Sequence, residues 1–145
     1  AQELLDLWIL ADTDIPNEDN YYDINDRSFI AKTLDYAAKH NGINYFYVLI
    51  EKKSGRMIGL TNVSFYTKGS GYAGQGISGI IPEYRNRGLC KYLKAAMLKK
   101  LLKDHPEILK GIRTGVNNNN YPILRITKLM GFRFTGNSVS YRLGV

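Results

Sequence analysis

The stretch that decides the fold is IIPEYRNRGLCKYLK, residues 80–94. It opens on two β-branched residues that suit the end of a strand, and it closes on an amphipathic run typical of a helix. A loop between the carboxyl end of a strand and a helix exposes unpaired N–H groups at the positive end of the helix dipole. The stretch therefore predicts an anion site, where Gly88 lets the backbone come close and Arg85 and Arg87 add positive charge. Taken by itself, the loop also fits a solvated connection without a ligand.

Length and composition indicate one globular domain over residues 1–145. The chain has a mass of 16.4 kDa, with 44% apolar and 23% charged residues, a balance typical of a packed core rather than of disorder. Cys90 is the single cysteine, which excludes an intramolecular disulfide. No apolar run approaches the roughly 20 residues of a membrane span, and no signal segment opens the chain. We therefore expect a cytoplasmic protein with no membrane partner.

The charges are unevenly distributed. Residues 1–26 carry eight acids and no Lys or Arg, whereas the remaining residues carry all 20 basic residues and five acids. This pattern indicates a basic body that meets an anion and an acidic segment, residues 12–26, that meets a cation. A merely solvated surface explains it equally well. Nucleic-acid binding is favoured by the pI of about 9.5, but no recognition motif is present, and we expect no nucleic acid as a partner.

Hydrophobic periodicity predicts a mixed α/β fold around one sheet. The strand 73–81, its following helix and the strand 111–116 form a βαβ unit, so these two strands should be parallel. The strand 45–50 should be buried on both faces, and residues 57–66 should contain a bulge because their apolar alternation slips phase. The expected helices are 2–11, 26–40, 89–104 and 120–130, the strands are 45–50, 57–66, 73–81 and 111–116, and a hairpin around Gly136-Asn137 closes the chain.

The 89–104 helix is expected to bury one stripe and to expose a basic face. The predicted stripe consists of Leu89, Tyr92/Leu93, Ala96/Met97 and Leu101. The predicted solvated face consists of Lys91, Lys94, Lys99, Lys100 and Lys103. The histidines and the acids Asp12, Asp14 and Glu18 lack the spacing of metal ligands, and we expect no metal.

Two motifs resemble those of the GNAT superfamily of N-acetyltransferases. RNRGLC, after a strand and before a helix, is similar to the R/Q-x-x-G-x-G/A signature of that family. TGVNNNNYPILRITKLMGFRF (114–134) resembles its second hallmark, with Asn120 at the conserved Asn and Gly131-Phe132 at the closing Gly-Phe. The resemblance covers essentially the whole chain. Within the superfamily, the chain looks most like the C-terminal half of tandem GNAT proteins related to mycothiol synthase.

The resemblance implies a mostly antiparallel sheet with a splayed parallel strand pair. The pantetheine arm of acetyl-CoA would enter the gap between the strands 73–81 and 111–116 and pair with the main chain like an added strand. The pyrophosphate would sit on the amides of Asn86 through Lys91, and glycines 74, 76 and 79 would admit the ligand. The implied CoA-binding residues are Ser78, Gly79, Ile80, Arg85, Asn86, Arg87, Gly88, Leu89, Cys90, Lys91 and Asn120.

The implied activity is direct transfer of an acetyl group from acetyl-CoA to a primary amine, and the acidic segment favours a cationic acceptor. Cys90 replaces the second Gly or Ala of the signature, and we interpret it as a packing residue. Thr127 stands where many members have a Tyr that protonates the leaving thiolate, and Gly115 stands where some have a Glu base. Thr127 is thus a weak catalytic candidate, since a hydroxyl is a poor proton donor near neutral pH.

Because this chain lacks the catalytic Tyr and Glu of the family at these two positions, the alternative function is a non-catalytic domain that binds CoA or scaffolds a catalytic partner. GNAT domains usually begin with a strand, yet this chain opens on a predicted helix. We therefore expect the first strand to be missing from this chain or to lie in an upstream half. A homodimer and a fused second GNAT domain are both open.

Overall fold

The computed structural model describes residues 2–15, 27–106, 110–139, 141, 143 and 144. Each predicted helix and each of the four central strands is present, with ends that differ from the predicted ones by a few residues. In chain order the elements are α1 (Gln2–Thr13), α2 (Arg27–Lys39), β1 (Gly42–Ile50), β2 (Met57–Tyr66), β3 (Tyr72–Ile80), the 3₁₀ turn η1 (Pro82–Tyr84), α3 (Leu89–Asp104), β4 (Gly111–Thr114) and α4 (Tyr121–Leu129).

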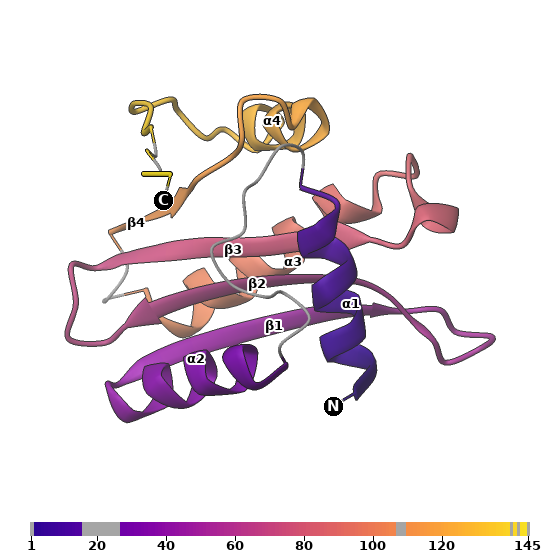
Figure 1. Cartoon of the computed structure of the whole chain (residues 1–145), viewed down its shortest axis with the longest axis horizontal. Helices are drawn as coiled ribbons and strands as arrows, with labels where there is room; N and C mark the ends of the chain where they lie inside the picture. Colours follow the sequence, from indigo (N-terminus) through magenta and orange to yellow (C-terminus); the bar gives the residue numbers. More distant parts are fainter. Residues whose placement is uncertain (1, 16–26, 107–109, 140, 142, 145) are drawn as a thin grey trace.

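The four strands form one mixed sheet in the order β1-β2-β3-β4. The pairs β1–β2 and β2–β3 are antiparallel, and β3–β4 is parallel, as the βαβ unit predicts. Helices α1 and α2 lie on one face of the sheet and α3 on the other, while α4 lies beyond β4 (Figure 1). The predicted α/β fold class, a mostly antiparallel sheet flanked by helices, is confirmed.

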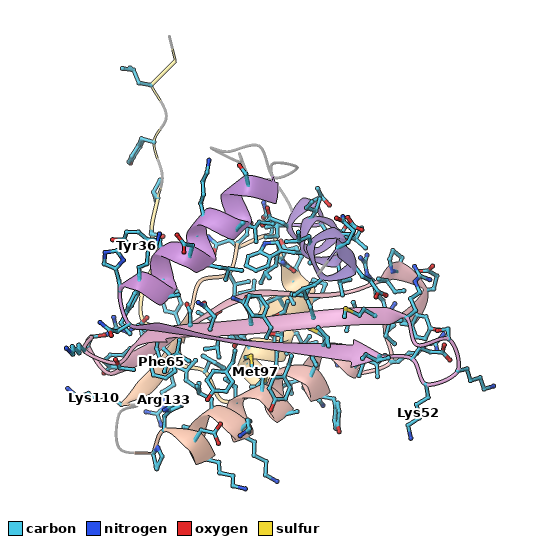
Figure 2. All side chains as sticks on the ribbon, turned by 90° about the horizontal axis from the view of Figure 1, so that it is seen from below. Tyr36, Lys52, Phe65, Met97, Lys110 and Arg133 are labelled. Carbon is cyan, nitrogen blue, oxygen red and sulfur yellow. The ribbon has the colours of Figure 1, made fainter. Side chains whose placement is uncertain are left out.

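Two apolar clusters hold these layers together. Between the sheet and α3, the buried side chains are Val63, Phe65, Ala73, Met97 and Leu101, and Figure 2 shows Phe65 and Met97 in this layer. The second cluster consists of Leu7, Ile58, Leu60 and Ile81. Each fully buried aliphatic side chain contributes about 1.5–3 kcal/mol, so α1 and α3 are both held firmly against β2 and β3.

The pairing of β2 is irregular on both sides. Toward β1, Leu49 pairs with Gly59 and Ile50 with Met57, so Ile58 is an extra residue within the predicted range. Toward β3, at the predicted slip in alternation, the extra residue lies on β3 instead. Thr61 pairs with Ser78, but Val63 pairs with Gln75, so the register shifts by one residue between them. Two residues of β3 thus lie opposite the single residue Asn62. The irregularity falls on β3 at the point where its pairing with β4 has just ended.

Two expectations for the sheet are wrong. The residues of β1 are half-buried or, at Ile50, exposed rather than buried on both faces, because among the described strands β1 lies at the edge of the sheet and pairs with β2 alone. The described residues from 132 to 144 contain no strand, so the expected hairpin does not form there. Phe134 is 80% exposed, and the described residues up to 139 continue without secondary structure; Figure 2 shows the C-terminal trace extending beyond the sheet and helices. Within the described part of the chain, no helix combines the length and apolar character needed to span a membrane.

Candidate functional site

The parallel strands β3 and β4 separate after a short paired stretch. They pair only from Tyr72–Gly111 to Gln75–Thr114, whereas β3 continues to Ile80 and the chain after Thr114 leads to α4. The predicted splay is therefore present. Residues 76–80 of β3 have no strand beside them on this side within the described sheet, so main-chain groups there can pair with an extended ligand, except for Ile80 O, which already accepts from Arg85 Nε.

A cavity of about 80 Å³ opens in this gap. It joins both faces of the sheet, since its walls include Ile15 beyond α1 and Lys94 of α3. The other walls are residues 76–78 of β3, residues 114–117 after and at the end of β4, and Asn120 and Ile123 of α4. Of the predicted site residues, Ser78 and Asn120 line this cavity. The Ser78 hydroxyl also forms a 2.7 Å hydrogen bond with the Thr61 hydroxyl.

The loop that leads from β3 to α3 presents free amides. Gly88 is the N-cap of α3 with φ of 74° and no side-chain cap, and the first helical bond runs from Tyr92 N to Gly88 O at 3.1 Å. The amides of Leu89, Cys90 and Lys91 therefore lie before the first intrahelical bond. A Cβ added at Gly88 would meet no atom within 4 Å, so the space in front of the loop is open. Asn86 also has a positive φ, 59°. This geometry suits an anion.

The two arginines of the signature brace this loop. The Arg85 Nε donates to Ile80 O at 2.8 Å, and its Nη2 forms an ion pair with Asp14. The Arg87 Nη2 donates to the main-chain oxygen of Glu83 at 3.0 Å, and its guanidinium lies 5.0 Å from the centroid of the Tyr84 ring. Arg85 thus ties the loop to the chain just after α1. Both arginines remain exposed at the loop.

The glycines of β3 have structural neighbours of their own. A Cβ on Gly79 would lie 2.5 Å from the Ala11 Cβ, and one on Gly76 would lie 2.6 Å from the Asn62 Oδ1. These two glycines therefore let α1 and Asn62 pack closely against β3. The packing of α1 and Asn62 is enough to account for glycine at these two positions, without a ligand. The main-chain groups of both glycines still border the gap.

Helix α4 presents Asn120 to the cavity but withdraws Thr127 from it. The Asn120 Oδ1 caps the helix by accepting from Ile123 N at 3.4 Å. Its Nδ2 group makes no hydrogen bond in the described structure and can face a ligand. The Thr127 hydroxyl donates to Ile123 O at 2.8 Å, and Thr127 is not among the residues that line the cavity. Its proton is already engaged in the helix.

Lys94 corrects the prediction of a fully solvated lysine face. It is only 3% exposed, whereas Tyr92 from the predicted buried stripe is 66% exposed. The reason is the side of α3 that packs against the sheet. The buried residues of the helix are Leu93, Lys94, Met97 and Leu101. Burial lowers the pKa of Lys94. Sequence reasoning missed this residue, although it stands three and seven positions before the predicted core residues Met97 and Leu101.

Cys90 lies one turn before Lys94 on α3. It is partly buried, and burial raises the pKa of its thiol, which the nearby Lys94 charge only partly offsets. A thiol whose pKa is raised is a weak nucleophile at neutral pH. The geometry agrees with a packing role.

Comparison with known proteins identifies the fold. Compared by sequence, the chain matches no protein-family model and no curated protein. Among solved structures, it resembles a putative acetyl transferase from Pyrococcus furiosus, with a TM-score of 0.71, 13% identity, and coverage of 98% of this chain and 93% of the other. It also resembles AAC(6')-Iy in complex with the bisubstrate analog CoA-S-monomethyl-acetylneamine, with a TM-score of 0.63, 16% identity and coverage of 97% and 92%.

A third similar structure is a tandem GNAT protein from the clavulanic acid biosynthesis pathway, with a TM-score of 0.67 and 21% identity. The match covers 86% of this chain but 37% of that protein. All three likenesses concern the fold. The chain has the fold of the GNAT acetyltransferases.

Proposed function

We propose that this protein is an acetyl-CoA-dependent N-acetyltransferase that acts on a primary amine by direct transfer. The observation that carries the proposal is the continuous gap along β3. Its unpaired edge at residues 76–80, the cavity beside it and the open amides at the start of α3 follow one another along the chain. In chain order, the cavity beside residues 76–78 would take the acyl end, the free edge up to Ile80 would take the arm, and the amides at the start of α3 would take the pyrophosphate, which is the order of these groups in acyl-CoA.

The residues that would hold acetyl-CoA are those of the gap and the loop. The pantetheine arm would pair with the main chain at Ser78, Gly79 and Ile80, and the free Nδ2 group of Asn120 would hold it from the opposite side. The pyrophosphate would sit on the amides from Asn86 to Lys91, at the positive end of the α3 dipole. Arg87 would add positive charge from the braced loop, whereas Arg85, whose charge is offset by Asp14, would hold the loop in place.

The transfer itself relies on position. A neutral amine that enters beside the thioester attacks its carbonyl carbon, and alignment in the gap supplies much of the rate. Main-chain amides of the unpaired β3 edge stabilise the charge that develops on the carbonyl oxygen. Cys90 takes no part in a covalent step, because its thiol lies in the helix and its pKa is raised.

A cationic acceptor follows from the acidic segment 12–26. Within the described part of this segment, Asp12 is buried and Asp14 is paired with Arg85. The other four acids, Glu18, Asp19, Asp23 and Asp26, lie outside the described residues. They carry the proposed preference for cations, which salt should weaken.

The resemblance to tandem GNAT proteins leads to a proposal about assembly. We infer that the domain acts beside a second GNAT domain, either fused to it or supplied by a second copy. The fold similarity to the tandem protein supports this inference. So does the resemblance of ADTDIP (11–16) and GLCKYLK (88–94) to the mycothiol-synthase-like branch. Light scattering on the whole protein would show whether it is a dimer.

Release of free thiol from acetyl-CoA over a panel of amines tests the activity. We expect turnover with at least one cationic amine, such as a polyamine, an aminosugar or a basic peptide. A non-catalytic CoA-binding domain is the second candidate, and the Thr127 hydroxyl favours it, since its bond to Ile123 O removes the one acid the family pattern offers. Calorimetric binding of CoA without thiol release for any amine would support that candidate.

A further inference from the structure

We propose that Lys94 is a catalytic residue whose ammonium group faces the sulfur of the bound acyl-CoA and donates a proton to the leaving thiolate. The inference rests on the proposed function and deepens it. It supplies the general acid that neither Thr127 nor the loop provides. Its basis is the position of one buried cation in the cavity between β3 and β4.

Lys94 stands in a place that the packing of the fold does not explain. It is 3% exposed on the face of α3 that packs against the sheet, where aliphatic side chains occupy the neighbouring buried positions. An ammonium group that loses its water must gain a partner or pay a large desolvation cost. In the described structure its side chain forms no hydrogen bond and no ion pair. It lines the cavity between β3 and β4, where a bound ligand could lie beside it.

The composition of the cavity wall indicates that a bound ligand supplies the partner that Lys94 lacks in the protein. The walls that the structure describes contribute main chain, aliphatic groups, hydroxyls and amides from β3, β4 and α4, with no carboxylate among them. A cation in such a wall matches a ligand that carries or develops negative charge there. Acyl-CoA does so, because the sulfur becomes a thiolate when the acyl group leaves.

The position along α3 separates this role from binding of the pyrophosphate. The free amides lie at Leu89–Lys91, while Lys94 lies about 4.5 Å beyond Lys91 and about 7.5 Å beyond Leu89 along the helix axis, at a rise of about 1.5 Å per residue. It lines the cavity together with residues 76–78 of β3, at the register shift where the strands begin to separate. Different parts of α3 would thus contact the two groups. The amides at its start would bind the pyrophosphate, and Lys94 would lie beside the sulfur where β3 and β4 separate.

The proton balance of the step is complete. The amine nitrogen forms a bond to the carbonyl carbon, the carbon–sulfur bond breaks, and its electron pair stays on sulfur. Lys94 Nζ gives a proton to that sulfur, the new amide nitrogen loses a proton to water, and solvent returns a proton to Lys94. Burial, the main influence on Lys94, lowers its pKa, so it releases the proton more readily than an exposed lysine.

The surroundings of Lys94 contain few groups that compete in titration. On α3, Cys90 is the charged or titratable group that acts on it. Among the described cavity residues of α4, β3, β4 and the end of α1, no other side chain titrates. A pH effect that Lys94→Met removes can therefore be assigned to Lys94, with Cys90→Ala as the check on the neighbouring thiol.

Binding of CoA and of desulfo-CoA tests the inference without knowledge of the acceptor. Calorimetry would give both affinities from pH 7 to pH 9, and thiolate absorbance would give the titration of the bound CoA thiol. In the wild type, we expect the bound thiol to ionise at a lower pH than that of free CoA, and CoA to gain affinity over desulfo-CoA as the pH rises. Lys94→Met should abolish both effects and leave desulfo-CoA affinity within about threefold. Lys99→Met, an exposed lysine on the same helix, should change neither.

Equal losses of affinity for CoA and desulfo-CoA in Lys94→Met would overturn the inference, because the ammonium would then contact another part of the arm. An unchanged thiol titration would also overturn it. If the wild type binds neither ligand, the proposed function fails first. Should Lys94→Met not fold, Lys94→Gln gives the same comparison with a polar side chain. With a known acceptor, either variant should lose at least about a hundredfold in kcat.

Discussion

Gly88 offers a test in which backbone strain and charge can be separated. Its φ of 74° is a left-handed conformation, and a Cβ there would meet no neighbouring atom. Substitution by Gln or by Glu therefore adds the same strain and nearly the same volume. The two variants differ in one negative charge, placed beside the amides that we assign to the pyrophosphate.

The expected magnitudes follow from this geometry. The left-handed φ costs a non-glycine residue about 1–2 kcal/mol, which lowers the Tm of both variants by about 2–8 °C at about 2–4 °C per kcal/mol. A carboxylate about 5 Å from a phosphate charge is repelled by about 1–3 kcal/mol in a partly solvated site. Gly88→Glu should thus bind CoA about 5- to 150-fold more weakly than Gly88→Gln.

Calorimetry on both variants at low and high salt measures this difference, with pantetheine, which lacks phosphate, as the control ligand. We expect the Glu–Gln difference to shrink as salt rises and to vanish for pantetheine. Equal CoA affinities in the two variants at low salt would refute the placement of the pyrophosphate at the start of α3.

The remaining predictions concern packing, the thiol and the buried lysine. Gly79→Ala places a Cβ against Ala11 and should cost about 1–3 kcal/mol of unfolding free energy, and adding Ala11→Gly should restore part of it. A purely additive double mutant would argue against the close contact of α1 with β3. Cys90→Ala should keep CoA affinity within about threefold, whereas a hundredfold loss would give the thiol a functional role. Burial lowers the pKa of Lys94 in the folded state. Between this lowered pKa and the ordinary pKa of lysine, the unfolded state binds more protons than the folded state, so Lys94 makes the free energy of unfolding of the wild type rise with pH. In urea unfolding at neutral pH, Lys94→Met should have a higher free energy of unfolding than the wild type. This difference should shrink as the pH rises toward the ordinary pKa of lysine, and a difference that does not change with pH would contradict a buried charge.

The parts of the fold that depend on local pattern could be predicted from the sequence. The strand, loop and helix of residues 80–94 follow from adjacent residues, and the slip in the apolar alternation of β2 marks where its register with β3 shifts, although the extra residue there belongs to β3. The separation of β3 from β4 was predicted by resemblance to a family. Spacing alone indicated only that these strands are parallel.

The errors arise where distant parts of the chain decide the outcome. The alternation after residue 131 suits a hairpin, but a strand needs a neighbour to pair with, and no local pattern shows whether β4 accepts one. Lys94 was assigned to solvent because lysine is rarely buried, and its burial depends on where the sheet opens above α3. The ion pair between Arg85 and Asp14 joins residues 71 positions apart, a contact that no short motif indicates.

The central claim is that an acyl-CoA binds in the gap between β3 and β4. A crystal structure of the protein with acetyl-CoA tests it most directly. The account predicts the pantetheine arm beside residues 76–80 of β3, the pyrophosphate on the amides before Tyr92, and the sulfur within hydrogen-bonding reach of Lys94 Nζ. Acetyl-CoA bound elsewhere on the molecule, with the gap closed by side chains, would contradict it.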